Sequence, residues 1–283
     1  MRRRLTILCT FFSIIISHLG AEIHHCANTS EVLPFFDKIT PNTLVIFDID
    51  DTLITKSDKI LRPIGNDHRT FYYFRLVQKF QFDHILYLVS LVELNARTQL
   101  VEYTWPSIIA DLQAKTPFVM GHTAAPPGRM GVFKSFPRAR HTTLKSFGID
   151  FSPIKQYYPN IHLTELNHIP DSSPMFYAGT LYSHDYSKGE ALATLLKHYD
   201  WQPDLVIFVD DLLNNLRSVE KELNKLKIPV LGIHYEESQL YNDTIDLNIA
   251  EIQYEYLVDQ QQWLNDQEAT QLLESKKSLD EAI

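Results

Sequence analysis

Short apolar runs that end in polar side chains recur along the chain. Residues 43–47 and 205–209 both lead directly into aspartates, and residues 117–120 and 228–233 have the same apolar character. β-Branched and aromatic residues dominate these runs, which is typical of strands buried on both faces of a parallel sheet. Stretches with helical spacing, such as residues 213–227, separate the runs and indicate right-handed β–α–β crossovers. The pattern therefore predicts an α/β fold with a parallel sheet.

The chain between the first two runs is longer than a crossover helix requires. Residues 71–91 are rich in Phe, Tyr, Leu and Val at helical spacing, so we interpret residues 57–112 as a helical cap inserted after the first strand. The core is then formed by residues 43–56 and 113–248, preceded by an N-terminal lead at residues 22–42. Residues 249–283 are expected to form a C-terminal helix and tail, and polar residues 152–174 indicate a second small excursion.

The first 21 residues have the pattern of a secretory signal peptide. A basic start, Met1 to Arg4, precedes an uncharged apolar run over residues 5–16 and small residues ending at Ala21. The apolar run is short for a bilayer span, and an uncleaved interfacial anchor is the alternative. We expect an exported protein, periplasmic or secreted, with no stable membrane span after signal removal. Removal would also leave Cys26 as the one cysteine, which excludes an intramolecular disulfide.

Composition narrows the functional classes. The 283 residues are 45% hydrophobic and 22% charged, as in ordinary globular proteins, and the formal net charge is -9. Nucleic-acid binding is disfavoured, because such proteins are normally basic. An acidic protein that binds an anion needs a local cation or a bound metal at the site.

The chemistry is expected at the strand ends, because ligands in open α/β sheets bind beyond the carboxyl ends of the strands. Asp48 follows the first apolar run at once, and Asp50 is two residues further on. One carboxylate can attack phosphorus as a nucleophile, and the other can protonate the leaving oxygen and then activate water. The polar side chains predicted at this edge are Asp48, Asp50, Thr52, Thr123, Asp210 and Asp211.

Clustered carboxylates require positive charge. Mg²⁺ prefers oxygen ligands, and Asp48, the carbonyl of Asp50, and Asp210 or Asp211 would supply them. Lys188 is the candidate fixed cation. It follows Ser187 in a Ser-Lys-Gly-Glu capping box, where a lysine opposes the helix dipole, so a role in holding phosphate is favoured.

These residues carry a resemblance to a known superfamily. Asp48-x-Asp50-x-Thr52-Leu53, a strand ending at Thr123, Lys188-Gly189, and Asp210-Asp211 with Asn215 occur in that order. The arrangement resembles the four motifs of the haloacid dehalogenase superfamily of phosphohydrolases over residues 43–235. Residues 148–152, 188–192, 210–216 and 234–235 are also similar to a branch of it found in intracellular bacterial pathogens.

The resemblance implies a Rossmann-like three-layer core, with Asp48 as nucleophile and Asp50 as general acid and base. It also implies that Thr52, Thr123 and Lys188 bind substrate phosphate, that Asp48, Asp50, Asp210 and Asp211 hold Mg²⁺, and that Asn215 supports them. Two positions depart from the branch. Ala125 stands where an arginine is expected, for which Arg129 is a possible substitute, and His122 is unusual at its place.

The sequence therefore predicts an exported Mg²⁺-dependent phosphatase for a small phosphorylated substrate or a phosphopeptide. Two alternatives remain open: a catalytically quiet member of the fold that acts as a secreted binding protein, and a phosphotransferase or mutase.

Other interpretations of single motifs are weaker. An EF-hand loop fails because Leu53 stands at the required glycine and Lys59 at the required glutamate. The pair His24-His25 is either a metal pair or two solvated histidines. The aromatic residues 71–74 suit a helical core, or a substrate pocket if they lie in the cap.

Overall fold

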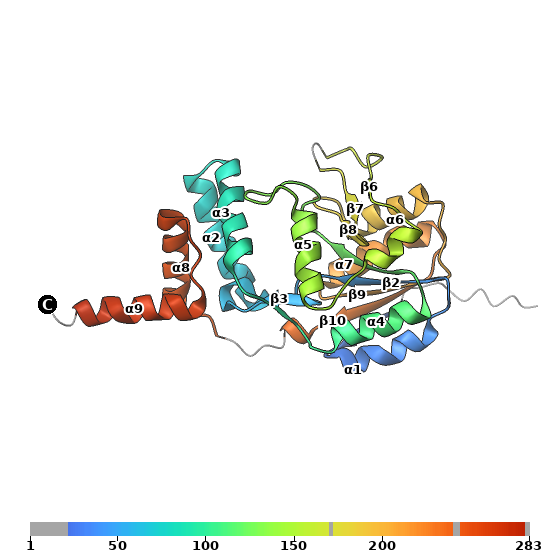
Figure 1. The fold of residues 1–283 in the computed structure, drawn as a ribbon, viewed down its shortest axis with the longest axis horizontal. Coiled ribbons are helices and arrows are strands. Elements are labelled where there is room, and N and C mark those ends of the chain that lie inside the picture. The colour runs from blue at the N-terminus through green and yellow to red at the C-terminus, as the bar shows by residue number, and fades with distance from the viewer. Residues whose placement is uncertain (1–21, 170–171, 240–243, 281–283) are drawn as a thin grey trace, which may run out of the picture.

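The central feature of the protein is an eight-stranded sheet with the order β1-β10-β9-β2-β5-β8-β7-β6 (Figure 1). The computed structural model describes residues 22–169, 172–239 and 244–280, so the predicted signal peptide lies outside the described residues. The strands are β1 (Glu22–Cys26), β2 (Thr43–Asp48), β5 (Val119–Thr123), β6 (Ile161–His162), β7 (Met175–Tyr177), β8 (Thr180–Tyr182), β9 (Leu205–Asp210) and β10 (Val230–Tyr235). Pairing is parallel from β1 through β8, and β7 and β6 extend the sheet antiparallel.

Helices cover both faces of this sheet because every position of its central strands is apolar or buried. Along β2, alternate side chains point to opposite faces: Val45 and Phe47 join one core cluster, and Leu44 and Ile46 join the other. The first face is covered by α1 (Thr29–Val32), α4 (Trp105–Lys115) and α5 (Phe136–Ser146), and the second by α6 (Lys188–His198) and α7 (Leu213–Lys225). This is a Rossmann-like three-layer α/β fold, which confirms the predicted fold class.

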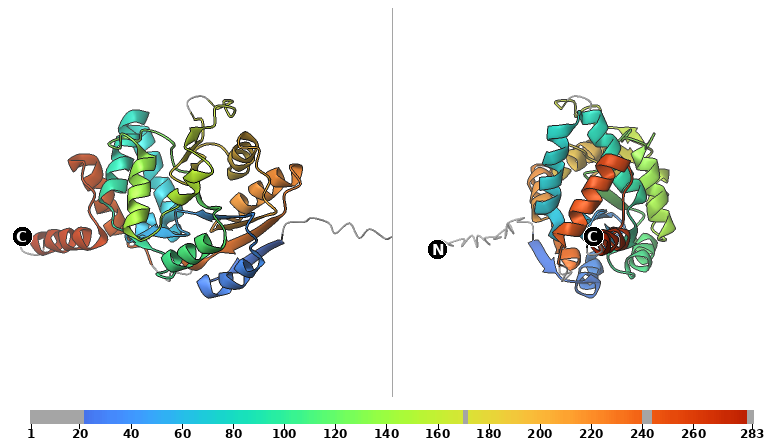
Figure 2. Two further views of the ribbon diagram at one scale, coloured as in Figure 1. Left: turned by 45° about the vertical axis from the view of Figure 1, so that its right-hand side comes forward. Right: turned by 90° about the vertical axis from the view of Figure 1, so that its left-hand side faces the viewer.

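A helical cap stands at one end of the sheet (Figure 2). Its helices α2 (Asn66–Lys79) and α3 (Phe82–Asn95) are connected to the core through the two-stranded sheet of β3 (Ile54–Lys56) and β4 (Thr98–Leu100). Leu76, Leu88 and Leu91 from these helices form a third core cluster together with Tyr254 and Trp263 from the C-terminal part. The elements that supply that part are α8 (Leu247–Gln260) and α9 (Asp266–Asp280).

Several segments lie in other parts of the fold than the boundaries predicted from the sequence would place them. Helix α4 lies within the range assigned to the cap, but Trp105, Ile109 and Leu112 pack against the sheet. The C-terminal α8 packs on the cap, and β1, in the range assigned to an N-terminal lead, pairs with β10 at the sheet edge. Among the described residues, no helix is both long enough and apolar enough to cross a bilayer.

Candidate active site

Three neighbouring strands end in the candidate site residues. Asp48 is the last residue of β2, Thr123 of β5 and Asp210 of β9. These strands are parallel neighbours, so their carboxyl ends meet at one edge of the sheet. Lys188, the first residue of α6, comes to the same edge because the Ser187 side chain accepts a hydrogen bond from the Glu190 backbone N–H and starts the helix there.

A buried lysine joins two of the carboxylates. Lys188 Nζ lies 2.5 Å from Asp48 Oδ1 and 2.7 Å from Asp210 Oδ2. Burial acts to lower the pKa of Lys188, but Asp210 and Asp48 outweigh it and raise the pKa, so the ammonium stays charged. Asn215 donates to both Asp210 oxygens, at 2.9 and 3.2 Å, and thereby fixes the carboxylate that faces the lysine.

The same edge holds a cluster of three carboxyl groups around Lys188. Carboxylate oxygens of Asp48, Asp210 and Asp211 lie within 4.8 Å of one another, and all three residues are buried. Burial and the neighbouring acids raise the pKa of Asp48 to about 7, against the opposing effect of Lys188. Burial, together with Asp48, Asp210 and Asp51, raises the pKa of Asp211 to about 10. Without a cation, bound protons therefore balance part of the charge of this cluster. With all three carboxyl groups ionised, two negative charges would remain beyond the one that Lys188 neutralises, and a divalent cation would match them.

Asp50 is held at the site by two partners from other elements. Thr123 Oγ1 donates to Asp50 Oδ2 at 3.1 Å, and Arg140 Nη1 of α5 lies 2.7 Å from Asp50 Oδ1. Arg140 is buried and also pairs with Glu93 of the cap helix α3, at 3.2 Å. The Asp50 side chain is still 48% exposed, so it is oriented by the protein and accessible to a ligand.

A tight turn directly follows the two candidate catalytic acids. Asp51 has a left-handed backbone, with φ 63°, and its N–H donates to the Ile54 carbonyl at 2.7 Å. Asn, Asp and Gly tolerate this conformation best among the residues. Thr52 is fully buried beneath the turn, where its hydroxyl accepts from the Asp211 N–H at 3.1 Å and lies 3.5 Å from Asp48 Oδ2. Thr52, predicted to bind substrate, therefore supports the turn and Asp48 from below.

A cavity that could admit an anion opens beside these groups. It has a volume of about 610 Å³, and we call it the anion cavity. Its lining includes Asp48, Asp50, Thr123, Lys188, Asp211 and Asn215. The structure thus brings together the residues that the sequence analysis placed at four separate motifs, with Asp210 directly behind them as the partner of Lys188.

Arg69 is a cavity residue that the sequence analysis missed. It belongs to the cap helix α2, lines the anion cavity and donates to the Leu61 carbonyl and the Asn66 side chain. Arg129, the proposed substitute for the arginine absent at Ala125, is instead exposed. Besides Lys188 and Arg140, the cap thus supplies a further cationic group near the acids, and the motif spacing contains no signal for it.

His122 is buried beside the site without a hydrogen-bond partner. Neither ring nitrogen has one among the described residues, and the ring stacks on Phe208 at a centroid distance of 6.0 Å. Burial, together with nearby Lys188, keeps the pKa of His122 well below its ordinary value. The imidazole is therefore neutral at physiological pH and packs as part of the core.

One protein family matches almost the whole of this fold. The family described as "Protein of unknown function (DUF2608)" matches residues 23–270, from the first strand to the first turn of α9. The chain belongs to this family.

The DUF2608 chain is also similar to several bacterial proteins. An uncharacterised protein of Rickettsia prowazekii is 23% identical over 96% of this chain and 99% of its own length. A second from the same organism is 25% identical over 84% of both chains. A Chlamydia pneumoniae protein is 30% identical over 29% of this chain and 31% of its own length. The name of that protein describes it as an outer membrane protein. No solved structure matches significantly.

Proposed function

We propose that this protein is an exported phosphomonoester hydrolase that works through an aspartyl-phosphate intermediate, as members of the haloacid dehalogenase superfamily do. The observation that carries the proposal is the convergence of two carboxylates in different environments, Asp48 and Asp50, with buried Lys188 around one cavity. A solvated acidic turn would not require a buried lysine or an arginine clamp at the same edge.

Asp48 is the nucleophile in this proposal. One of its carboxylate oxygens attacks phosphorus, and the bond between phosphorus and the ester oxygen breaks. Burial disfavours the charged carboxylate, so the ion pair with Lys188 keeps a reactive anion at a fixed position. Lys188 and Arg69 then face the phosphoryl oxygens, where their charges stabilise the negative charge of the transition state.

Asp50 is the general acid and base. It gives a proton to the departing alcohol oxygen and afterwards takes one from the water that attacks the aspartyl-phosphate, so that inorganic phosphate leaves and Asp48 is restored. The hydrogen bond from Thr123 and the ion pair with Arg140 orient its carboxylate for both steps. Because it is half exposed, it can exchange protons with water between turnovers.

Mg²⁺ fits the remaining charge. Asp48, Asp210 and Asp211 would hold it together with the Asp50 carbonyl, and hard oxygen ligands of this kind suit the ion. When bound, Mg²⁺ supplies charge neutralisation for the phosphoryl group. Within the chain itself, Asn215 and Lys188 keep Asp210 in place.

The decisive experiment replaces the nucleophile. Wild-type protein with Mg²⁺ should hydrolyse p-nitrophenyl phosphate, and Asp48→Asn should abolish turnover because an amide does not attack phosphorus. Asp37→Asn is the matched control, since Asp37 is exposed and far from the site. Equal rates for wild type and Asp48→Asn would refute the mechanism, and an inactive wild type that also fails to trap beryllium fluoride would favour a binding protein.

Export is part of the proposal. The signal-like pattern of residues 1–21 predicts it, and the name of the chlamydial relative, which concerns the outer membrane, agrees with an exported protein. We place the mature protein in the periplasm or outside the cell. Fractionation of the native organism, with a cytoplasmic marker enzyme as control, tests this placement.

A further inference from the structure

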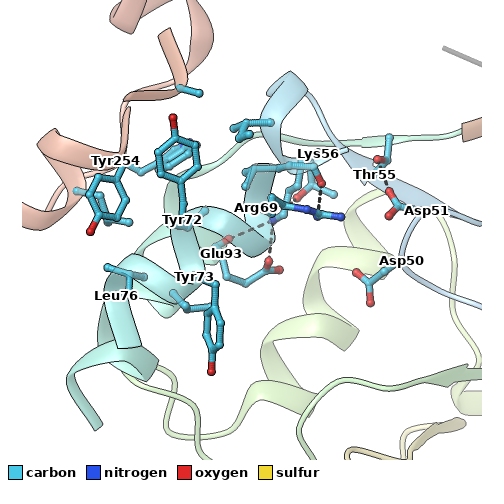
Figure 3. A pocket seen from close by; sticks show the side chains of 18 of the residues that line it. Asp50, Asp51, Thr55, Lys56, Arg69, Tyr72, Tyr73, Leu76, Glu93 and Tyr254 are labelled. Carbon is cyan, nitrogen blue, oxygen red and sulfur yellow. Dashed lines mark hydrogen bonds and ion pairs between the residues drawn. The ribbon is translucent and has the colours of Figure 1, made fainter. Parts of the chain in front are cut away.

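A second cavity opens on the cap side of Asp50. Its volume is about 390 Å³, within the size range of small-molecule pockets, and we call it the apolar cavity. Its walls come from α2, α3, α8 and the segment that follows β2 (Figure 3). Carbon-rich side chains form most of the lining, among them Tyr72, Tyr73, Leu76, Val92, Leu257 and Trp263.

The apolar cavity lies next to the anion cavity. Asp50, Asp51 and Arg69 line both of them. Figure 3 shows Asp50 and Asp51 at one end of the apolar cavity and the rings of Tyr72 and Tyr254 at the other. A substrate whose phosphate lies at Asp48 would therefore extend its alcohol part past Asp50 and into this cavity.

The charged groups in the lining are engaged with one another. Lys56 Nζ pairs with Glu93 at 3.0 Å, and Arg140 pairs with both Asp50 and Glu93. Arg69 donates to the Leu61 carbonyl. A polyhydroxylated group in this cavity would lose its hydrogen bonds to water and find these donors already occupied, which is unfavourable. An alkyl or aryl group has no such loss and gains from burial.

We propose that the substrates are small phosphomonoesters of apolar alcohols, with the alkyl or aryl group bound in the apolar cavity. This inference rests on the proposed phosphatase function. In the reaction the phosphorus–ester oxygen bond breaks, the alcohol leaves with the proton from Asp50, and water supplies the new oxygen of inorganic phosphate. The apolar cavity selects the alcohol, and the anion cavity holds the phosphate that all such esters share.

The test compares two alkyl esters with alcohols of similar leaving ability. With Mg²⁺, n-octyl phosphate should have a kcat/KM at least about tenfold above that of glycerol 3-phosphate, because its chain fills the apolar cavity. Val92→Trp narrows the cavity and should remove most of that preference. Leu94→Trp on the same helix is the control, since Leu94 is 57% exposed and lies outside the lining.

The outcomes separate the two ideas. Hydrolysis of both esters at equal kcat/KM would overturn the apolar substrate class and leave the phosphatase intact. Hydrolysis of neither ester, nor of p-nitrophenyl phosphate, would overturn the phosphatase itself. Calorimetric binding of n-octylphosphonate to the Asp48→Asn protein gives a readout that does not depend on turnover. Adding Val92→Trp to this protein should weaken the binding. Equal affinity of the Asp48→Asn protein and the double variant would count against the apolar cavity as the binding site.

A different observation carries a second inference, at His25, His234 and Glu236. His25 and His234 are register partners on the parallel strands β1 and β10. His234 Nδ1 lies 3.0 Å from His25 Nδ1 and 3.0 Å from Glu236 Oε1, and His25 Nδ1 lies 3.2 Å from the same oxygen. The neighbouring His24 points to the other face of the strand and packs on Phe35, so the sequence pair His24-His25 is not itself the cluster.

The hydrogen bonding of His234 prepares this cluster for a metal ion. His234 Nε2 lies 2.9 Å from the Asp211 carbonyl oxygen. A carbonyl can only accept, so Nε2 carries a proton, and Nδ1 is the ring nitrogen that faces His25 and Glu236 and is left for a metal ion. Metal-binding histidines commonly donate their other N–H to a backbone carbonyl in this way. Zinc bonds of about 2.0–2.1 Å in a tetrahedron place ligand atoms about 3.3 Å apart, close to the spacing of the three atoms here.

We infer that His25, His234 and Glu236 form a site for a Zn²⁺-class ion, separate from the carboxylate cluster. Calorimetric titration of the protein with ZnCl₂ in excess Mg²⁺ should show one tight equivalent, which His25→Ala and Glu236→Gln should abolish and His24→Ala should retain. X-ray absorption should show two imidazole ligands. Absence of tight zinc binding in wild type, or unchanged zinc binding in both His25→Ala and Glu236→Gln, would overturn this site. The three side chains would then only be hydrogen-bonded to one another.

Discussion

Gly189 sits where the start of α6 touches α7, and its replacement tests how Lys188 is positioned. A Cβ at this residue would lie 2.1 Å from the Ser218 carbonyl oxygen and 2.5 Å from the carbonyl carbon. Both are backbone atoms, so the two helices must separate by about 1 Å to relieve the overlap. Overpacking of this kind typically costs about 1–3 kcal/mol, and the better helix propensity of alanine offsets at most about 1 kcal/mol of it.

We therefore expect Gly189→Ala to lower the free energy of unfolding by up to about 2 kcal/mol, the overpacking cost that remains after about 1 kcal/mol of helix propensity is subtracted, as measured by urea denaturation. The displacement also moves Lys188 relative to Asp210 and Asn215, which are held by β9 and α7, so kcat on p-nitrophenyl phosphate should fall as well. Gly128→Ala is the matched control, because a Cβ at Gly128 would have no other atom within 4 Å. If both variants have the stability and kcat of wild type, helix contact at Gly189 does not set the lysine position.

Three further buried side chains are open to similar tests. His122→Leu removes an unpartnered imidazole and should raise the free energy of unfolding by about 1–3 kcal/mol. The folded-state pKa of His122 lies below its ordinary 6.5, so wild type loses stability as the pH falls below 6.5. The difference in unfolding free energy between the variant and wild type, measured by urea denaturation, should therefore widen at low pH. The pKa of Asp211 is raised from 3.8 to about 10, so metal-free stability from this group is fully present below pH 3.8 and is lost as pH rises toward 10. Under the proposed binding of Mg²⁺ at Asp211, the ion would displace that proton, so the stabilisation that Mg²⁺ adds in thermal unfolding should be larger at pH 8 than at pH 6 and small in Asp211→Asn. An increment that does not change with pH would contradict this. Trp263→Phe removes a 2.8 Å hydrogen bond to Asp58 and should lower the free energy of unfolding by about 1.5–3 kcal/mol. Trp201→Phe should cost less, because the partner of Trp201 at 3.3 Å is an uncharged asparagine. Equal losses of unfolding free energy in urea denaturation would contradict a role for the Asp58 charge.

The core strands were predictable because burial on both faces leaves a plain trace in the sequence. Residues 43–47 and 205–209 are apolar at nearly every position, and the structure has β2 and β9 there as neighbouring parallel strands. The acids that follow such runs must lie at one sheet edge, which is why Asp48 and Asp210 could be expected together. The capping box at Ser187 likewise fixed the start of α6 and the place of Lys188.

The remaining features depend on contacts between distant segments, for which a single sequence holds no periodic signal. Arg69 and Arg140 lie on amphipathic helices among other basic residues, and their approach to the acids follows from how α2 and α5 pack. The apolar character of Trp105 and Leu112 suits a cap or a core equally well, and contact with the sheet decides between them. For the same reason the pairing of β1 with β10 could not be inferred from residues 22–26.

The joining of α8 to the cap has a consequence for the order in which the molecule matures. Helices α2 and α3 leave the ribosome, and pass through any export channel, well before Tyr254, Leu257 and Trp263, which complete their shared cluster. A nascent chain thus has every residue that lines the anion cavity before the C-terminal wall of the apolar cavity has been made. The apolar cavity is complete only after synthesis reaches Trp263 and α8 packs against α3.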